Sequence, residues 1–320
     1  MNRVFVKKDD PLYKYTINFM EKSWGTKGKG IFPGCQPISI EREHFGILEK
    51  NNYVVCEKTD GTRYMMIAIQ FGMQKVCVFI NRALEMFVAP LNFRMAVFKG
   101  TILEGELYNN EFMIYDCLMT CGEVVGNQGF LERLDHCEKT VKKAMVLKTD
   151  SITLKVKTFH LHRDFKEFMD KYLPKVKQEI DGLIFTPIDQ PIRIGTHNTM
   201  FKWKPRNKNT IDFLVKKGPT AETPGCVPGA HVWRLYIQDR GKHIFESSIP
   251  VEKMSDYKWL KIGDIVECMY VNWENGPVWW KPIKKRSDKT FPNSRRTFYR
   301  TLVNIKENII MKEFLDCTPV

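Results

Sequence analysis

Three lysines in two short segments have the residue types and spacing for chemistry on a phosphate. Lys58 lies in the segment 57–63, Glu-Lys-Thr-Asp-Gly-Thr-Arg, and Lys202 and Lys204 lie two residues apart in 201–205, Phe-Lys-Trp-Lys-Pro. A deprotonated lysine amine can attack phosphorus and form a covalent intermediate that divides one transfer into two steps. Burial or nearby positive charge must first lower its pKa. Taken alone, the first segment fits a solvated hairpin lysine as well, so other residues must decide.

The first two thirds of the chain predict a sheet that positions Lys58. Runs rich in β-branched and aromatic residues, separated by turn signals such as Asp60-Gly61, predict an antiparallel meander in which Lys58 ends the first strand. A helix is expected over 39–50 with Ser39 as its N-cap. The meander strands are expected at 53–58, 63–71, 75–80, 101–107 and 111–118, further strands at 151–159, 180–186 and 199–204, and helices at 129–146 and 163–173.

After residue 208 the pattern changes to short strands followed by a helix. Five strand-like runs in fewer than ninety residues predict a small barrel, for which an OB-fold is the obvious candidate. We therefore expect an α+β protein with a first domain at 1–208, an OB-fold domain at 209–293 and a C-terminal helix at 294–320. The five runs are 210–217, 231–238, 242–248, 263–271 and 277–285.

Composition narrows the class of protein and its compartment. The 320 residues carry 50 Lys+Arg against 37 Asp+Glu, a net charge of +13, which is compatible with plain solubility or with a polyanionic partner. The nine cysteines include no CxxC pair, so buried free thiols are expected rather than zinc or disulfides. Neither a signal-peptide core nor a membrane-length apolar run is present, which predicts a soluble intracellular protein that does not engage a membrane.

The segment around Lys58 resembles the signature of the covalent nucleotidyltransferases, the superfamily of mRNA capping enzymes and polynucleotide ligases. Their Lys-x-Asp-Gly-x-Arg is present as Lys58, Asp60, Gly61 and Arg63. Six further segments that resemble motifs of this superfamily follow in the family's order. They are 78–82 (VFINR), 103–107 (LEGEL), 112–116 (FMIYD), 181–185 (DGLIF) and 201–205 (FKWKP), and 286–289 (RSDK) resembles the last motif of the series.

The resemblance implies a role for each matching residue. The chain departs from the family pattern at Asn81 and Glu104, where aspartate is more usual. GTP is expected to bind between the two domains, the OB-fold domain then closing over it. Lys58 is implied as the nucleophile, with Asp60 and Arg63 beside it, Arg82 and Glu106 at the ribose, Tyr115 under the purine, Asp181 near phosphate and metal, Lys202 and Lys204 on the transferred phosphate, and Arg286, Asp288 and Lys289 on the leaving pyrophosphate.

Three features favour a capping enzyme over a ligase. The segment 32–39, Phe-Pro-Gly-Cys-Gln-Pro-Ile-Ser, is similar to one that precedes the active lysine in capping enzymes, and it includes Gln36. Asp181-Gly182 replaces the Glu-Gly that ligases tend to have. Lys157, in Lys-Val-Lys-Thr-Phe, resembles the lysine that donates to guanine O6, where adenine would present a donor instead.

The resemblance thus implies a guanylyltransferase that forms lysyl-GMP from GTP with Mg²⁺ or Mn²⁺, then transfers GMP to a 5′-diphosphate RNA end. An RNA triphosphatase, a cap methyltransferase or an RNA polymerase are the expected protein partners. A nuclear location is expected for a cellular protein and a cytoplasmic factory for a viral one. Two alternatives remain open: an ATP-dependent polynucleotide ligase, and a non-catalytic OB-fold protein that binds nucleic acid.

Overall fold

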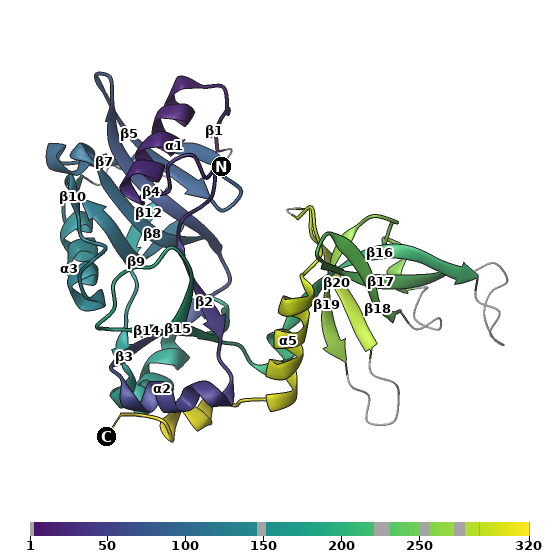
Figure 1. Cartoon of the computed structure of the whole chain (residues 1–320). Coiled ribbons are helices and arrows are strands. Elements are labelled where there is room, and N and C mark those ends of the chain that lie inside the picture. Colours follow the sequence, from purple (N-terminus) through teal and green to yellow (C-terminus); the bar gives the residue numbers. More distant parts are fainter. Residues whose placement is uncertain are drawn as a thin grey trace. The chain divides into compact units, whose positions relative to one another are not determined.

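The computed structural model describes residues 3–145, 152–220, 231–249, 256–271, 279–287 and 289–319. The chain divides into two compact units (Figure 1). Unit 1 comprises residues 1–38, 44–203 and 314–320, and unit 2 comprises 39–43 and 204–313. Each unit is therefore built from segments far apart in the sequence. No helix among the described residues is long and apolar enough to span a membrane.

Unit 1 contains two large sheets. The first is mainly antiparallel with the order β1-β6-β5-β4-β8-β9-β10, and β12 pairs with β9 in parallel. Its strands are β1 Phe5–Val6, β4 Thr62–Phe71, β5 Gln74–Asn81, β6 Met86–Ala89, β8 Thr101–Tyr108, β9 Glu111–Thr120, β10 Glu123–Val124 and β12 Thr153–Val156. Helices α1 Pro11–Ser23 and α3 Phe130–Val141 contribute to the two cores on either side of it, and β7 Asn92–Phe93 pairs with β11 Ala144–Met145.

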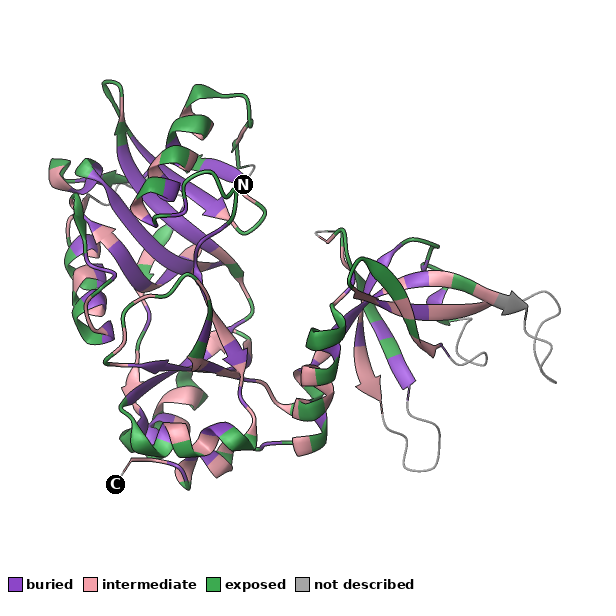
Figure 2. Cartoon of the chain, in the orientation of Figure 1, coloured by how far each residue is buried: buried purple, intermediate pink, exposed green. Residues whose placement is uncertain are grey.

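Alternation along β4 shows why this sheet is buried on both faces. Met66 and Ala68 contribute to one hydrophobic cluster, whereas Met65 and Ile67 contribute to the other. Successive side chains of a strand point to opposite faces, so a continuous apolar run fills two cores at once. In Figure 2 the central strands of this sheet are accordingly buried along most of their length.

The second sheet of unit 1 has the order β13-β3-β14-β15-β2. Aromatic side chains fill the core on one of its faces; Phe185 lies 4.8 Å from Phe314 and 5.4 Å from His162, measured between ring centroids. Its strands are β2 Cys35–Ser39, β3 Tyr53–Thr59, β13 His160–Leu161, β14 Ile180–Pro187 and β15 Gly195–Trp203. The short helical segments of this part are Arg42–His44, α2 Phe45–Lys50, Met95–Lys99, His162–Asp164, α4 Phe165–Glu167, Phe168–Tyr172 and Leu173–Lys175.

Unit 2 is a five-stranded antiparallel sheet with the order β18-β17-β16-β19-β20. One face carries the hydrophobic core, to which helix α5 contributes Phe298 and Ile305. Ser294 caps α5 by accepting a hydrogen bond from the Thr297 amide. The elements are 3₁₀ Arg206–Lys208, β16 Thr210–Thr220, β17 His231–Asp239, β18 Lys242–Ser248, β19 Ile265–Val271, β20 Trp279–Lys285, α5 Arg295–Glu307 and 3₁₀ Met311–Leu315.

Two local predictions were wrong. Ser39 ends strand β2 and does not cap a helix; a 3₁₀ turn begins at Arg42 and α2 only at Phe45. The strands on either side of Asp60-Gly61 do not pair with each other, because β3 pairs with β13 and β14 whereas β4 pairs with β5 and β8. In both cases pairing with strands distant in the sequence outweighs the local signal.

The other strand predictions of unit 1 and the five strand positions of unit 2 were confirmed within a few residues. The eight cysteines among the described residues are free, and all but Cys121 are buried, as the absence of paired motifs predicted.

Candidate active site

Lys58 lies where the chain passes from one sheet of unit 1 to the other. It is the penultimate residue of β3, and β4 of the other sheet begins at Thr62. Its side chain is 24% exposed, and its Nζ donates to Asp181 Oδ2 over 2.8 Å. Asp181 belongs to β14, whose Gly182 pairs with Lys58. The lysine is therefore held in a defined position on a rigid strand and remains accessible.

Asp60 does not contact Lys58 through any interaction found among the described residues. Its side chain is exposed in the turn, and its amide donates to the Glu179 carbonyl over 3.3 Å. The structure thus places Asp60 in the connection between the sheets rather than beside the amine.

Arg63 is fixed by the segment 32–36 and by Glu104. Its Nη1 donates to the Cys35 carbonyl over 2.6 Å, its Nη2 pairs with Glu104, and its guanidinium lies 5.3 Å from the centre of the Phe32 ring. Gly34 has no room for a side chain, because a Cβ there would lie 2.3 Å from Arg63 Nη2. Burial raises the pKa of Glu104, and the Arg63 guanidinium opposes this rise. The Phe-Pro-Gly segment therefore helps to hold the Arg63 side chain in place.

Gln36 and Arg82 also come together, although they are 46 residues apart. Arg82 Nη2 donates to Gln36 Oε1 over 3.4 Å at the exposed side of the site. The resemblance implies Arg82 at the ribose, and this contact brings Gln36 of the segment 32–39 beside it.

Glu106 binds the loop that follows Lys58. One oxygen of its carboxylate accepts from the Thr59 hydroxyl and the other from the Gly61 amide, the latter over 3.1 Å. A Cβ at Gly61 would lie 2.7 Å from Glu106 Cγ, so a glycine is required at this close approach. Glu106 therefore fixes the loop between the two sheets.

Lys157 is buried beside β3. Its Nζ donates to the Thr59 hydroxyl over 3.3 Å and lies 3.5 Å from Glu57 Oε1. The side chains of Lys157 and Glu57 are each only 5% exposed. The second carboxylate oxygen, Glu57 Oε2, is buried with no hydrogen-bond partner among the described residues. Burial, together with the Glu57 charge, raises the pKa of the neighbouring Tyr172 to about 12.

Tyr115 is half-buried next to an ion pair that anchors β9. Burial raises the pKa of Tyr115, which keeps its phenol neutral.

Arg133 donates to both oxygens of Asp116 over 2.7 and 3.1 Å and also donates to the Gln128 and Gln190 carbonyls. A buried arginine with four such acceptors is a structural anchor.

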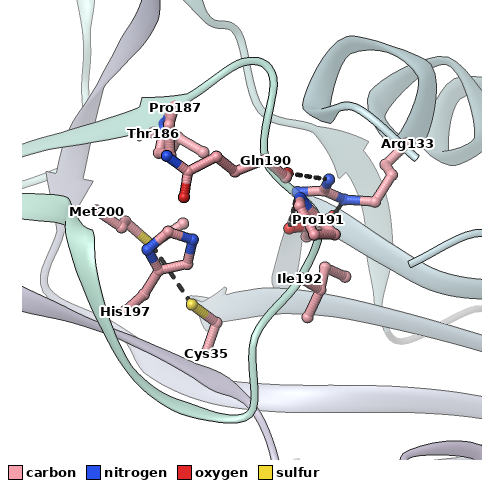
Figure 3. A pocket seen from close by; sticks show the side chains of 10 residues that line it. Cys35, Arg133, Thr186, Pro187, Gln190, Pro191, Ile192, His197 and Met200 are labelled. Carbon is pink, nitrogen blue, oxygen red and sulfur yellow. Dashed lines mark hydrogen bonds and ion pairs between the residues drawn. The ribbon is translucent and has the colours of Figure 1, made fainter. Parts of the chain in front are cut away.

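Figure 3 shows the small pocket that this ion pair helps to line. Its volume is about 10 Å³, room for roughly one water molecule. Lys58 does not line it. The pocket therefore lies apart from the nucleophile and is too small for a nucleotide. Its walls come from Cys35, Asp116, Arg133, Thr186, Pro187, Gln190, Pro191, Ile192, His197 and Met200.

Lys202 of the segment 201–205 lies on the same side of the second sheet as Lys58, whereas Lys204 follows the end of β15. Lys202 pairs with Ile184, which in turn pairs with Cys56, two residues before Lys58. Directly paired residues share a face and alternate residues of one strand do too. Lys202 and Lys204 are both half-buried. Strand register therefore places the Lys202 cation on the face that carries Lys58.

Arg286 and Lys289 are held by carboxylates of unit 2. Arg286 Nη1 lies 3.1 Å from Asp212 Oδ1 and 3.6 Å from Glu267 Oε2, and Lys289 pairs with the same Asp212. Asp212 is buried at the start of β16. Asp288, the third residue expected in this set, lies outside the described residues.

Sequence reasoning missed Glu57, Gly34, Arg133 and Asp212. Glu57 could have been noticed as a charged residue inside an otherwise apolar strand, because such a charge needs a partner. Arg133 and Asp212 act through partners distant in the sequence and gave no local signal, whereas Gly34 lies in the segment 32–39 that the resemblance singled out.

Comparison with known proteins supports the resemblance to the capping-enzyme family. Residues 6–206 match the family described as mRNA capping enzyme, catalytic domain, and residues 208–315 match mRNA capping enzyme, C-terminal domain. The mRNA-capping enzyme of Danio rerio is 30% identical over 92% of this chain and 50% of its own length. The mRNA-capping enzyme subunit alpha of Schizosaccharomyces pombe is 25% identical over 90% of this chain and 80% of its own length.

Solved structures of ligases are also similar to this chain, but with lower sequence identity than the capping enzymes. A mycobacterial DNA ligase D complexed with ATP and MES has a TM-score of 0.45 and 14% identity, covering 82% of this chain and 97% of its own. The ATP-dependent DNA ligase from bacteriophage T7 has a TM-score of 0.40 and 12% identity, covering 79% of this chain and 98% of its own.

Unit 1 has a nucleotidyltransferase-like fold. The chain belongs to the mRNA capping enzyme family. It spans about half the length of its relatives from Danio rerio and Mus musculus.

Proposed function

We propose that the chain is a GTP-dependent mRNA guanylyltransferase with Lys58 as its nucleophile. The observation that carries the proposal is the accessible Lys58 amine on a rigid strand, 2.8 Å from Asp181 and on the face that carries Lys202. In the first step a nitrogen–phosphorus bond forms to the α-phosphate of GTP, and the bond to the β-phosphate oxygen breaks, releasing pyrophosphate. In the second step the β-phosphate oxygen of a 5′-diphosphate RNA end displaces Lys58, giving the GpppN cap.

The nucleophile must lose a proton before it attacks. An ammonium has no lone pair, and Asp181 Oδ2 is the acceptor in direct contact with Lys58 Nζ. We assign Asp181 as the first acceptor for this proton. The same contact orients the amine, which lowers the entropic cost of reaching the attack geometry.

Cationic side chains stabilise the charge that develops on the transferred phosphate. Lys202 lies on the face of Lys58 and supports this role, and Lys204, two residues further along the chain, is proposed to share it. Arg286 and Lys289 are proposed to engage the β- and γ-phosphates, which requires that they exchange their contacts with Asp212 for phosphate oxygens.

Guanine recognition is assigned to Lys157. An ammonium has three donors, and two of them are directed at Thr59 and Glu57, which leaves one for guanine O6. Adenine presents an amino donor at the same position and would leave two donors facing each other. Tyr115 is proposed to lie under the purine, and Arg63, Arg82 and Glu106 at the ribose.

A divalent metal ion, Mg²⁺ or Mn²⁺, fits the donor set around Lys58. The described residues include no cluster of three or more metal-ligating side chains. Magnesium is typically held by one or two carboxylates together with substrate phosphates, and Asp181 offers one such carboxylate. The metal would supply further charge compensation at the phosphates.

Unit 2 is proposed to be an OB-fold. Its strands follow the order 3-2-1-4-5 within the unit, and β18 lies close to β20, the first and last strands of that order. These two observations support a barrel that closes between β18 and β20.

The name of the Schizosaccharomyces pombe relative, subunit alpha, supports a complex with other capping components. An RNA triphosphatase, a cap methyltransferase and an RNA polymerase are the proposed partners, and the site of capping, nucleus or viral factory, is the proposed location.

The test is covalent labelling. Incubation with α-³²P-labelled GTP and Mg²⁺ or Mn²⁺ is expected to leave label on the denatured chain, and Lys58→Ala should abolish it. Lys155→Ala is the matched control, since Lys155 is an exposed strand lysine in unit 1 that pairs with Glu111. Labelling by ATP alone would favour a ligase, and no labelling by either nucleotide would favour a non-catalytic binder.

A further inference from the structure

The outer face of the unit 2 sheet carries a cluster of cations and aromatic rings on β16, β17 and β18. We call Lys216, Arg234, Tyr236 and Phe245 the aromatic-basic face. Lys216 pairs with Arg234 across β16 and β17, and Tyr236 pairs with Phe245 across β17 and β18. Their neighbours in the sequence, such as Val215, Leu235 and Ile237, fill the core on the other side. Alternation therefore directs the four side chains away from the core.

The rings and cations of this face contact each other. Lys216 Nζ lies 4.6 Å from the centre of the Tyr236 ring, and the Arg234 guanidinium lies 5.1 Å from that of Phe245. The two rings are 5.8 Å apart at an interplanar angle of 65°. Phe245 is 47% exposed. A solvent-exposed phenylalanine with a guanidinium over its ring combines an aromatic surface with a positive charge.

A glycine makes room for Arg234. A Cβ at Gly218 would lie 2.8 Å from the Val232 carbonyl oxygen and 3.1 Å from Arg234 Cγ. The Arg234 side chain thus lies across β16 at a residue that lacks a side chain of its own.

The aromatic-basic face continues toward the cations proposed to bind phosphate. Asp212 and Lys216 lie on the same side of β16, because they are four positions apart on a strand whose side chains alternate. Asp212 holds Arg286 and Lys289. One side of a single sheet therefore carries both groups of cations.

We propose that the aromatic-basic face binds the single-stranded 5′ region of the acceptor RNA. This inference rests on the proposed function, because it names how that enzyme holds its second substrate. Tyr236 and Phe245 stack on bases, and Lys216 and Arg234 bind the backbone phosphates. Strands two and three of OB-folds commonly bind oligonucleotides, and β17 and β18 hold these places in unit 2. Stacking does not select among bases, so the RNA is bound without sequence preference.

An acidic or phosphorylated peptide would use the two cations but has no need of the two rings. Every RNA base has a π-face, and an arginine plane can itself stack on it. The interleaving of rings with cations therefore favours RNA over a peptide.

The test compares RNA binding with the reaction at Lys58. The double variant Tyr236→Ala/Phe245→Ala is expected to raise the Kd for a 5′-diphosphate oligouridylate of about 12 nucleotides at least tenfold, roughly the loss of one stacked base. Fluorescence anisotropy measures that Kd and needs no GTP. Formation of lysyl-GMP should be unchanged in the same variant, which also shows that the chain is folded, whereas the KM for RNA in GMP transfer should rise.

Tyr299→Ala is the matched control. Tyr299 is a similarly exposed ring on α5 of unit 2, and Arg295 lies over it at 5.6 Å. It is expected to leave the Kd unchanged. Lys216→Gln and Arg234→Gln should each reduce the slope of log Kd against log salt by about 0.7, the contribution of one phosphate contact on a single strand.

Two results would overturn the proposal. One is a Kd in the Tyr236→Ala/Phe245→Ala variant equal to that of Tyr299→Ala. The other is binding of a phosphoserine peptide that depends on these residues while RNA binding does not. A wild-type chain that gives no lysyl-GMP would instead refute the proposed function, and the anisotropy measurement would still report on the face.

Discussion

Replacing Lys157 by methionine should strongly destabilise unit 1, because it leaves the Glu57 carboxylate buried without its cation. Methionine preserves most of the volume of the side chain but removes the charge. The two side chains are each 5% exposed, and Glu57 Oε2 already lacks a hydrogen-bond partner among the described residues. Breaking a buried pair from one side typically costs about 3–5 kcal/mol. For a unit of this size that lowers Tm by roughly 6–20 °C.

The assay is urea denaturation and thermal unfolding of wild type, Lys157→Met, and the double variant Lys157→Met/Glu57→Gln. The double variant should recover much of the lost stability, because glutamine removes the isolated charge. Replacing both members of a buried pair is often nearly neutral, so recovery separates the charge effect from lost packing. A cost below about 1 kcal/mol for Lys157→Met, or no recovery in the double variant, would refute this reasoning.

The same double variant separates stability from nucleotide choice. If Lys157 donates to guanine O6, the folded double variant should lose GTP-over-ATP discrimination more than it loses affinity for the phosphates. Unchanged discrimination, measured as the ratio of kcat/KM values for covalent labelling, would contradict the guanine assignment of Lys157.

Three further predictions follow from single contacts. Gly34→Ala should reduce the rate of covalent labelling by roughly 100-fold, since the new methyl group displaces Arg63; unchanged labelling kinetics would contradict this. Burial lowers the pKa of His162 to about 4, although its hydrogen bond to the Phe314 carbonyl opposes this. The unfolded state therefore binds more protons between pH 6.5 and 4, so stability should fall by about 3 kcal/mol as the pH is lowered through that window, and urea titrations should show a smaller fall in His162→Gln. Asp212→Asn should tighten inhibition by pyrophosphate roughly tenfold by freeing the two cations that Asp212 holds, and weaker inhibition would mean that Asp212 positions them instead.

Most strands were predictable from the sequence because their signals are local. Alternating or continuous apolar runs ending at Gly, Asn or Asp identified β4, β5, β8 and β9 and the five strands of unit 2. The pairing of strands was less predictable, and the meander prediction failed at Asp60-Gly61. A turn signal indicates that the chain changes direction, but it does not indicate which strand the following residues will pair with.

For the candidate site, too, the sequence determined some features and the tertiary structure determined others. The sequence by itself determined which residues could do chemistry: Lys58 within its signature, the motifs that follow in order, and the family that the comparisons bear out. Only the tertiary structure decided what those residues contact. Asp181 is 123 residues from Lys58, and Lys157 is 98 from Thr59, yet each pair is in hydrogen-bond contact. Motifs are local in the chain, whereas burial and ion pairing arise only when sheets fold together, because a charge needs its partner only once water is excluded.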